Sequence, residues 1–562
     1  MHFLLSKEDQ TVFLLGNEAI ARASIETGVR VGAAYPGTPS SEIANSLFEI
    51  SGELKGFYFE FSVNEKVAME VVGAAAASGL PAITCMKHVG LNVASDAFMS
   101  LAYIGVRAGL VVVTADDPSC HSSQNEQDNR YYARLAQVPM LEPSDPQSAF
   151  ELTKRAFEIS QKLELPVILR TTTRVSHARA SVKVGKIPWK TYETFEKVRF
   201  EKEPFRFVPV PAVARKRHQL LLEKMQEAQS MAEGFEFNQL SIKGKKGICV
   251  SGVAVNYVLD AIDALGEDVS LLILSFTHPF PKGLAKEFLS SVEECLVVEE
   301  LEPYLEEQLK VTAYENGLNT KIIGKDVFKR FHELDPKEVK EKLASFLGNK
   351  KFSIEVPPFD FEKDLPQRPP VLCQGCPHRE TYKVIKEVLT ELGVEKDTIY
   401  PTDIGCYTLG IMPPFNMADY LLCMGSSVGT SCGFDVATTQ RIVAFIGDST
   451  FFHAGIPPLV NAKYNKHSFI LVVLDNDTTA MTGHQPVPSQ ELKPPQLAER
   501  PVISIKRLVE AMEIPCIEIN PYKKEEAKSK VKDFIERHEL GVIVSKAPCV
   551  LYKAKVQKRK RG

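Results

Sequence analysis

The chain has 562 residues, of which 44% are hydrophobic and 25% charged, and its formal net charge is −4 at pH 7. These values are ordinary for a soluble globular protein of three or four domains at ~150 residues each, and the charge gives no indication of nucleic-acid binding. The first nine residues lack the basic start and apolar stretch of a signal peptide. We find no apolar run long enough to span a bilayer and therefore expect a cytoplasmic protein.

The first region, residues 1–200, is predicted to be an α/β domain. Apolar runs at residues 82–86, 109–115 and 166–170 are separated by helical stretches. Parallel strands give such runs because helices cover both faces of their sheet.

Two polar motifs interrupt this pattern. The motif Tyr-Pro-Gly-Thr-Pro-Ser-Ser at 35–41 predicts a turn and a helix start, where backbone amides and the Thr38 hydroxyl would suit a substrate carboxylate. Glu65 is predicted in the first turn of a helix of small residues. In that position a Glu is also expected simply to complement the helix dipole.

The middle of the chain predicts two linkers around a second α/β domain. Residues 201–243 are charged and helical in pattern, and residues 353–370 are rich in proline and should stay extended. Between them, residues 244–352 contain three apolar strands at 246–252, 271–274 and 295–300. The third α/β domain is predicted at 371–562.

A metal and diphosphate site is predicted in the third domain. Two apolar strands, 441–446 and 468–474, are joined by a candidate crossover helix at 453–466 and are followed by Asp448 and Asn476. Ligands bind at the carboxyl ends of parallel strands, so both side chains should face one crevice. With a backbone carbonyl near Thr478 they form a set of hard oxygens suited to Mg²⁺, and Gly447 lets the turn approach an anion.

The eleven cysteines do not predict a disulfide framework in so long a chain. Cys373 and Cys376 form a C-x-x-C motif, and Cys406 follows a short strand. The C-x-x-C motif alone is compatible with a redox pair, half of a zinc site or chance.

These motifs resemble a known family. Gly-Asp-Ser at 447–449 followed by Asn476 is similar to the thiamin diphosphate motif, with Ser449 in place of the commoner Gly. The motif at 35–41, Val-Asn-Glu-Lys-Val-Ala at 63–68, Met-Lys-His-Val-Gly-Leu-Asn at 86–92, Asp-Asp-Pro at 116–118 and Asn-Glu-Gln-Asp at 125–128 resemble alpha subunits of indolepyruvate ferredoxin oxidoreductases. These belong to the thiamin-dependent 2-oxoacid:ferredoxin oxidoreductases.

The resemblance covers nearly the whole chain and implies the order of its domains. The expected fold class is α/β, with three parallel-sheet blocks. A pyrimidine-type thiamin diphosphate-binding fold and a diphosphate-type one would flank a transketolase-C-like domain.

The resemblance also implies roles for individual residues. Glu65 would be the carboxylate that activates the cofactor, Thr38 a substrate or cofactor contact, and Arg134 a partner of the substrate carboxylate. Other expected cofactor contacts are Gly405, Gly425, Ser426, Met481 and Thr482.

An iron-sulfur cluster follows from the same resemblance. Cys549 matches the place where relatives supply a fourth ligand, so Cys373, Cys376, Cys406 and Cys549 are expected to hold one [4Fe-4S] cluster. Zinc is the alternative occupant. Family members usually continue into a ferredoxin-like domain, which we expect to be absent here, so a separate ferredoxin-like carrier would accept the electrons. The basic tail at 558–561 would guide that carrier or be simply a solvated end.

The expected function is the oxidative decarboxylation of an aryl- or related 2-oxoacid to acyl-coenzyme A. The expected cofactors are thiamin diphosphate, Mg²⁺ and one cluster, in a heteromer with a smaller beta-type subunit. Two alternatives remain: a non-redox thiamin decarboxylase or carboligase, and a catalytically idle scaffold subunit.

Overall fold

The computed structural model describes residues 1–348, 365, 370–494, 497–537 and 539–559. The chain forms two compact units, Met1–Pro358 and Phe359–Gly562. Both units contain parallel sheets covered by helices, so the predicted α/β fold class is confirmed. In the described ranges, no helix is long and apolar enough to cross a membrane. Almost all of the linker predicted at 353–370, and the tail residues 560–562, lie outside these ranges.

The first unit is built around a seven-stranded sheet that is parallel except at one edge. The apolar runs predicted at 82–86, 109–115 and 166–170 form its centre. Every residue of β5 is buried, as expected for a strand covered on both faces. In sheet order the strands are β12 (Phe276–His278), β6 (Met140–Leu141), β7 (Val167–Thr172), β5 (Leu110–Asp116), β4 (Ala82–Lys87), β2 (Val31–Ala34) and β3 (Tyr58–Phe61).

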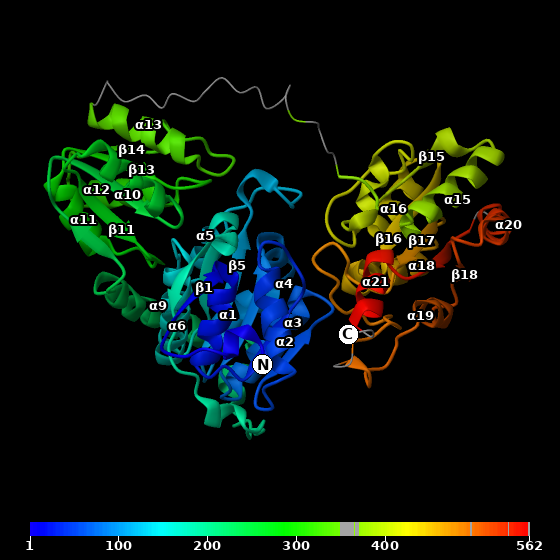
Figure 1. Cartoon of the computed structure of the whole chain (residues 1–562), viewed down its shortest axis with the longest axis horizontal. Helices are drawn as coiled ribbons and strands as arrows, with labels where there is room; N and C mark the ends of the chain where they lie inside the picture. Colours follow the sequence, from blue (N-terminus) through cyan, green and yellow to red (C-terminus); the bar gives the residue numbers. More distant parts are fainter. Residues whose placement is uncertain (349–364, 366–369, 495–496, 538, 560–562) are drawn as a thin grey trace. The chain divides into compact units, whose positions relative to one another are not determined.

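Helices cover both faces of this sheet (Figure 1). On one face α1 (Gly16–Glu26) packs against α2 (Ser41–Ser51) and α6 (Pro146–Leu163). On the other face α3 (Glu65–Ala77) packs against α4 (His88–Ile104). The remaining elements of this block are the antiparallel pair β1 (Thr11–Leu15) and β8 (Arg179–Lys183), and the short helices α5 (Arg130–Ala136) and α7 (Thr173–His177).

A second sheet completes the first unit. The three strands predicted in the middle of the chain are present as β10 (Lys246–Ser251), β11 (Ser270–Leu274) and β13 (Glu294–Val298). Strands β9 (Gln239–Ser241) and β14 (Lys321–Ile323) lie at its edges. The flanking helices are α9 (Pro211–Glu233), α10 (Ala254–Leu265), α11 (Lys282–Ser291), α12 (Tyr304–Glu315) and α13 (Pro336–Leu347).

The two blocks of the first unit share structure. Strand β12 comes from the second block but pairs with β6 of the first sheet. The Arg130 guanidinium, fully buried, bonds to Asp128 of the first block and to Glu299 of the second, each at 2.6 Å. A shared sheet and a buried ion pair therefore hold the two blocks together.

The second unit contains a five-stranded parallel sheet. Side chains of its central strands alternate between two cores: Val443 and Phe445 face one, while Ala444 and Ile446 face the other. The strands in sheet order are β15 (Thr398–Ile399), β16 (Arg441–Gly447), β17 (Ile470–Asp475), β19 (Gly541–Lys546) and β18 (Cys516–Ile519).

Helices α15 (Pro377–Glu391) and α20 (Lys524–Ile535) cover one face of this sheet. Helices α16 (Ser426–Ala437), α18 (Ile456–Tyr464) and α19 (Ile505–Ala511) cover the other (Figure 1). The crossover helix predicted at 453–466 is present as α18, and the last described helix is α21 (Val550–Arg559).

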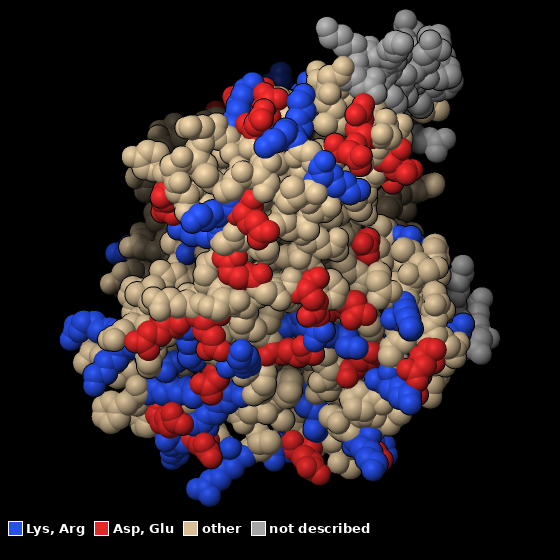
Figure 2. Space-filling view, turned by 90° about the vertical axis from the view of Figure 1, so that its left-hand side faces the viewer, with Lys and Arg blue, Asp and Glu red and all other residues tan. Residues whose placement is uncertain are grey.

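Figure 2 shows one face of the protein, on which basic and acidic side chains are interspersed. This pattern agrees with the net charge of −4. As far as its residues are described, this face lacks the continuous basic surface that a nucleic-acid backbone binds.

Candidate functional site

Asp448 and Asn476 lie at the carboxyl ends of neighbouring parallel strands. Asp448 follows β16 and Asn476 follows β17, and both side chains are buried. The Asp477 backbone N–H donates to Asp448 Oδ2 at 3.0 Å, and the Ser449 N–H donates to Asp448 Oδ1 at 2.7 Å. The structure thus brings the residues that follow β16 and β17 together at the carboxyl-terminal end of the sheet.

Three carboxyl groups, those of Asp448, Asp475 and Asp477, lie close together at this end of the sheet. Burial and the neighbouring Asp475 carboxyl raise the pKa of Asp448 well above its usual range. Burial raises the pKa of Asp475 to about 6, although Lys546 opposes the shift, and burial also raises the pKa of Asp477. A divalent cation would supply the missing positive charge. The Asp448 carboxylate, the Asn476 amide oxygen and the Thr478 carbonyl are chemically suited to hold Mg²⁺.

Asp403 organises the residues predicted to contact the diphosphate. Its buried carboxylate accepts backbone N–H bonds at the start of α16 from Gly425, Ser426 and Ser427, at 2.6, 2.9 and 3.1 Å. Burial raises the pKa of Asp403 to about 7. The sequence analysis missed Asp403, whose only signal is its place two residues before Gly405.

The Tyr407 ring is the reason why positions 405 and 447 are glycines. A Cβ atom at Gly405 or at Gly447 would collide with the Tyr407 ring. The Tyr407 hydroxyl donates to the Ile404 carbonyl at 3.1 Å. The glycines therefore make room for an aromatic ring between the two loops.

The loop after β17 is held by polar contacts. The Thr482 hydroxyl donates to Gln485 Oε1 at 2.6 Å, and Gln485 Nε2 returns a bond to the Thr482 carbonyl at 2.7 Å. The Thr479 hydroxyl donates to the Ser449 hydroxyl at 3.0 Å. Met481 is 54% exposed at the tip of this loop.

The four predicted cluster cysteines lie near one another. Burial, and then the charges of the other three thiols, raise the pKa of the Cys406 thiol to about 12. Cys376 is the N-cap residue of α15, and burial raises the pKa of its thiol. The Cys549 N–H donates to the Asn476 carbonyl at 2.9 Å, so the cysteines adjoin the residues after β17.

The cysteines do not form a closed ligand cage. Among the described residues, no three Cys, His, Asp or Glu side chains converge in a way that could hold a metal ion. Four cysteine thiols that lie near one another are still a set of donors that suits an iron-sulfur cluster.

Glu65 is the first residue of α3 and is buried, with 5% of its surface exposed. A Cβ atom at Gly90 would lie 2.8 Å from Glu65 Oε1. The missing side chain at Gly90 therefore lets the carboxylate sit against the first turn of α4. A Glu that only complemented its own helix dipole would not need this buried position.

Thr38 lies close to the same strand ends. Its hydroxyl is 3.3 Å from the Ser41 hydroxyl at the start of α2. The adjacent Gly37 packs against the aliphatic part of Lys87, whose ammonium group donates to the Ser122 carbonyl at 2.9 Å. Burial lowers the pKa of Lys87, while the charges of Asp117 and Glu65 oppose the shift. No role was predicted for Lys87 from the sequence, although it is the last residue of the buried strand β4.

Arg134 lies on α5 with its side chain 54% exposed, 3.9 Å from the Glu307 carboxylate of the second block. The neighbouring Arg130 on the same helix is the buried arginine. The role of Arg134 in substrate binding stays a prediction.

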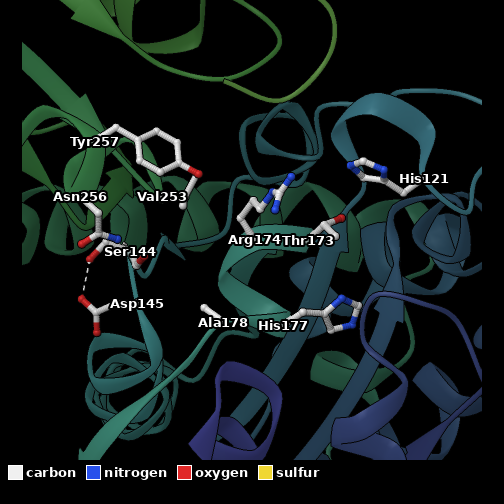
Figure 3. Close-up of a pocket in the computed structure, with 10 residues that line it drawn as sticks. All are labelled: His121, Ser144, Asp145, Thr173, Arg174, His177, Ala178, Val253, Asn256 and Tyr257. Atoms are coloured by element: carbon white, nitrogen blue, oxygen red, sulfur yellow. Dashed lines mark hydrogen bonds between the residues drawn. The ribbon is translucent and has the colours of Figure 1, made fainter. Parts of the chain in front are cut away.

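A pocket of about 520 Å³ opens between the two blocks of the first unit (Figure 3). His121, Arg174 and His177 line it from the first block, and Tyr257 extends toward Arg174 from the second. Glu333 accepts hydrogen bonds from the Arg174 guanidinium and lies 3.3 Å from His121 Nε2. The pocket thus combines basic side chains with an aromatic ring.

Family models match both units. Residues 22–239 match "Pyruvate flavodoxin/ferredoxin oxidoreductase, thiamine diP-bdg", and residues 403–545 match "Thiamine pyrophosphate enzyme, C-terminal TPP binding domain". These two domains define the class of the protein, the thiamin diphosphate-dependent 2-oxoacid:ferredoxin oxidoreductases.

Full-length relatives narrow the class. Indolepyruvate oxidoreductase subunit IorA of Methanothermobacter thermautotrophicus is 52% identical over 99% of this chain and 90% of its own length. The subunit of the same name from Thermococcus kodakarensis is 44% identical over 100% of this chain and 89% of its own length. The chain therefore belongs to the family of indolepyruvate oxidoreductase IorA subunits.

More distant matches include 2-oxoglutarate synthase subunit KorA of Archaeoglobus fulgidus, 27% identical over 32% of this chain and 54% of its own length. A solved structure of 2-oxoglutarate:ferredoxin oxidoreductase from Magnetococcus marinus aligns at 14% identity with a TM-score of 0.49, covering 60% of this chain and 66% of the other.

Proposed function

We propose that this subunit catalyses the oxidative decarboxylation of an indolepyruvate-like 2-oxoacid to acyl-coenzyme A, passing electrons through a [4Fe-4S] cluster to a ferredoxin-like carrier. The observation that carries the proposal is the buried group of Asp448 and Asn476 on adjacent strand ends beside four clustered cysteines. When bound, thiamin diphosphate supplies the electron sink for decarboxylation. A smaller beta-type subunit completes the enzyme.

The second unit would hold the anionic end of the cofactor. Asp448, Asn476 and the Thr478 carbonyl would bind Mg²⁺, and Gly405, Gly425, Ser426, Gly447 and Ser449 would line the diphosphate. Met481 and Thr482 would lie in the loop over the reactive ring. Support comes from the crowding of carboxylates at this edge, which a divalent cation relieves.

The first unit would supply the activating carboxylate. Glu65 would accept a hydrogen bond from the protonated ring nitrogen of the aminopyrimidine and hold it in the form that removes a proton. Its burial against Gly90 supports this role, because water is excluded from the carboxylate. Thr38 and Arg134 would bind the carboxylate of the 2-oxoacid, with Lys87 as a second cationic candidate close to Glu65.

Cys373, Cys376, Cys406 and Cys549 would ligate the cluster, which when bound accepts single electrons. Their mutual proximity supports this assignment over inert buried thiols.

Coenzyme A would enter by the pocket between the two blocks (Figure 3). Arg174 and His121, which pair with Glu333, and His177, which pairs with Glu42, would exchange these carboxylates for its phosphate groups. Tyr257 suits its adenine ring. Arg174→Gln should raise the KM for coenzyme A and leave the KM for the 2-oxoacid unchanged. Arg155→Gln, which alters another paired surface arginine, serves as the control. An unchanged KM for coenzyme A in Arg174→Gln contradicts this site.

The deciding experiment is purification of the chain with its partner subunits in the absence of air. We expect bound iron and sulfide in equal amounts and 2-oxoacid-dependent reduction of a ferredoxin. Cys549→Ser should lose the bound iron and the ferredoxin reduction. Cys516→Ser, at a half-buried cysteine outside the proposed cluster, should retain iron and activity.

The alternatives give different results. An iron-free protein with fully active Cys549→Ser favours a non-redox decarboxylase or carboligase. An intact protein that binds neither thiamin diphosphate nor Mg²⁺ in calorimetry is left with only a scaffold role.

A further inference from the structure

His378 connects the cysteine cluster with the residues that follow β17. It is the second residue of α15, immediately after the Cys376-Pro377 pair, and its side chain is 3% exposed. Its Nε2 atom lies 3.0 Å from Asn476 Nδ2. The proposed binding of Mg²⁺ by Asn476 does not itself involve this imidazole.

The contacts of Asn476 fix the direction of this hydrogen bond. The Thr478 backbone N–H approaches Asn476 Oδ1 at 3.3 Å, so the oxygen end of the carboxamide faces Thr478. The amide nitrogen then faces His378, and it can only donate. His378 Nε2 must therefore be the acceptor, which places the ring proton of the neutral imidazole on Nδ1.

This arrangement turns the amide oxygen toward the Thr478 N–H and away from His378. The loop that carries Thr478 also bonds to Asp448 through the Asp477 N–H at 3.0 Å. If the carboxamide turned over, its NH₂ group would face this loop, and a cation bound there would meet a hydrogen-bond donor instead of an oxygen ligand. The hydrogen bond to the imidazole therefore acts together with the Thr478 N–H bond to make Asn476 offer an oxygen ligand.

We propose that His378, as the Nδ1–H tautomer, is a positioning residue that holds the Asn476 oxygen toward the Mg²⁺ of the cofactor site. This inference rests on the proposed function, in which Asn476 binds that ion. His378 lies two residues after Cys376 in the chain, and the Asn476 carbonyl accepts the Cys549 N–H at 2.9 Å. The same pair of residues therefore joins the magnesium site to two of the cluster cysteines.

The test is the affinity of the full chain for thiamin diphosphate, measured by calorimetry over a series of Mg²⁺ concentrations. His378→Phe keeps a ring against Tyr407 but removes the acceptor. Changing a residue that orients a metal ligand costs roughly 10–100-fold in metal affinity, and we expect a loss of that size. His467→Phe, at a histidine paired with Asp435 in the same unit, should bind as the wild type does.

A rescue separates orientation from folding. In His378→Phe combined with Asn476→Asp, the ligand carries two equivalent oxygens and needs no orientation, so most of the Mg²⁺-dependent affinity should return. An affinity as low as that of His378→Phe alone would overturn the inference, as would a His378→Phe variant that binds like the wild type.

The tautomer can be observed without any cofactor. In protein labelled with ¹⁵N-histidine, the signals missing from His378→Phe should show an unprotonated Nε2 and a protonated Nδ1 at pH 7. A protonated Nε2 overturns the inference alone. Wild-type protein whose cofactor affinity does not depend on Mg²⁺ overturns the proposed magnesium site, and this inference with it.

Discussion

The backbone N–H of Asp477 donates to Oδ2 of Asp448 at 3.0 Å, so the loop after β17 closes onto the acidic residue after β16. The bond explains how two residues twenty-nine positions apart in sequence form one site. It requires that β16 and β17 lie side by side in parallel register, as they do here, and their apolar sequences are typical of such buried parallel strands.

Asp448→Ala should abolish the Mg²⁺-dependent binding of thiamin diphosphate. The change removes the proposed carboxylate ligand and leaves the cation with weaker neutral oxygens. Calorimetry with and without Mg²⁺ measures the effect. Asp435→Ala, which removes another acidic side chain of the same unit, is the control. Retention of the wild-type affinity would refute the metal site.

Glu65→Gln should leave cofactor affinity unchanged while slowing exchange of the cofactor C2 proton by ~10²–10⁴-fold. Glutamine has the same shape and still fits against Gly90. Its neutral amide lacks the negative charge with which Glu65 would stabilise the protonated ring nitrogen. Proton exchange followed by NMR provides the measurement. Glu70→Gln changes an exposed glutamate on the same helix and should exchange normally. Equal rates in the wild type and Glu65→Gln contradict the assignment.

The sequence predicts the sheets better than it predicts the contacts between distant residues. Strands β4, β5, β16 and β17 follow from their apolar runs, and the pairing of Asp448 with Asn476 follows from the order of the strands. The capping of α16 by Asp403 does not, because it depends on the path of a loop more than twenty residues long.

The two arginines of α5 show the same limit. Arg130 and Arg134 are one turn apart on one helical face, so periodicity cannot tell which of them is buried. The packing of the second block decides it, by placing Glu299 beside Arg130 and leaving Arg134 about half exposed.

Arg130→Met should destabilise the first unit by ~3–5 kcal/mol, because it leaves the buried carboxylates of Asp128 and Glu299 without their partner. Arg134→Met removes an exposed pair with Glu307 and should cost less than about 1 kcal/mol. Denaturant unfolding followed by fluorescence compares the two variants. Equal effects would show that the buried network does not hold the two blocks together.

His278 should make the first unit less stable in mild acid. Burial lowers the pKa of His278 to about 4 from the ordinary 6.5, and its Nδ1 lies 3.1 Å from the Tyr304 hydroxyl. Between these two pH values the unfolded chain binds a proton that the folded chain excludes. Stability is therefore fully present above pH ~6.5 and falls as the pH drops toward 4, by on the order of 1.4 kcal/mol per pH unit for this one group. The slope should shrink by about that amount in His278→Gln when unfolding is measured at several pH values in this window. His332→Gln, at a histidine whose side chain is 60% exposed, serves as the control variant. If His278→Gln retained the full slope, other buried groups would have to account for the acid sensitivity.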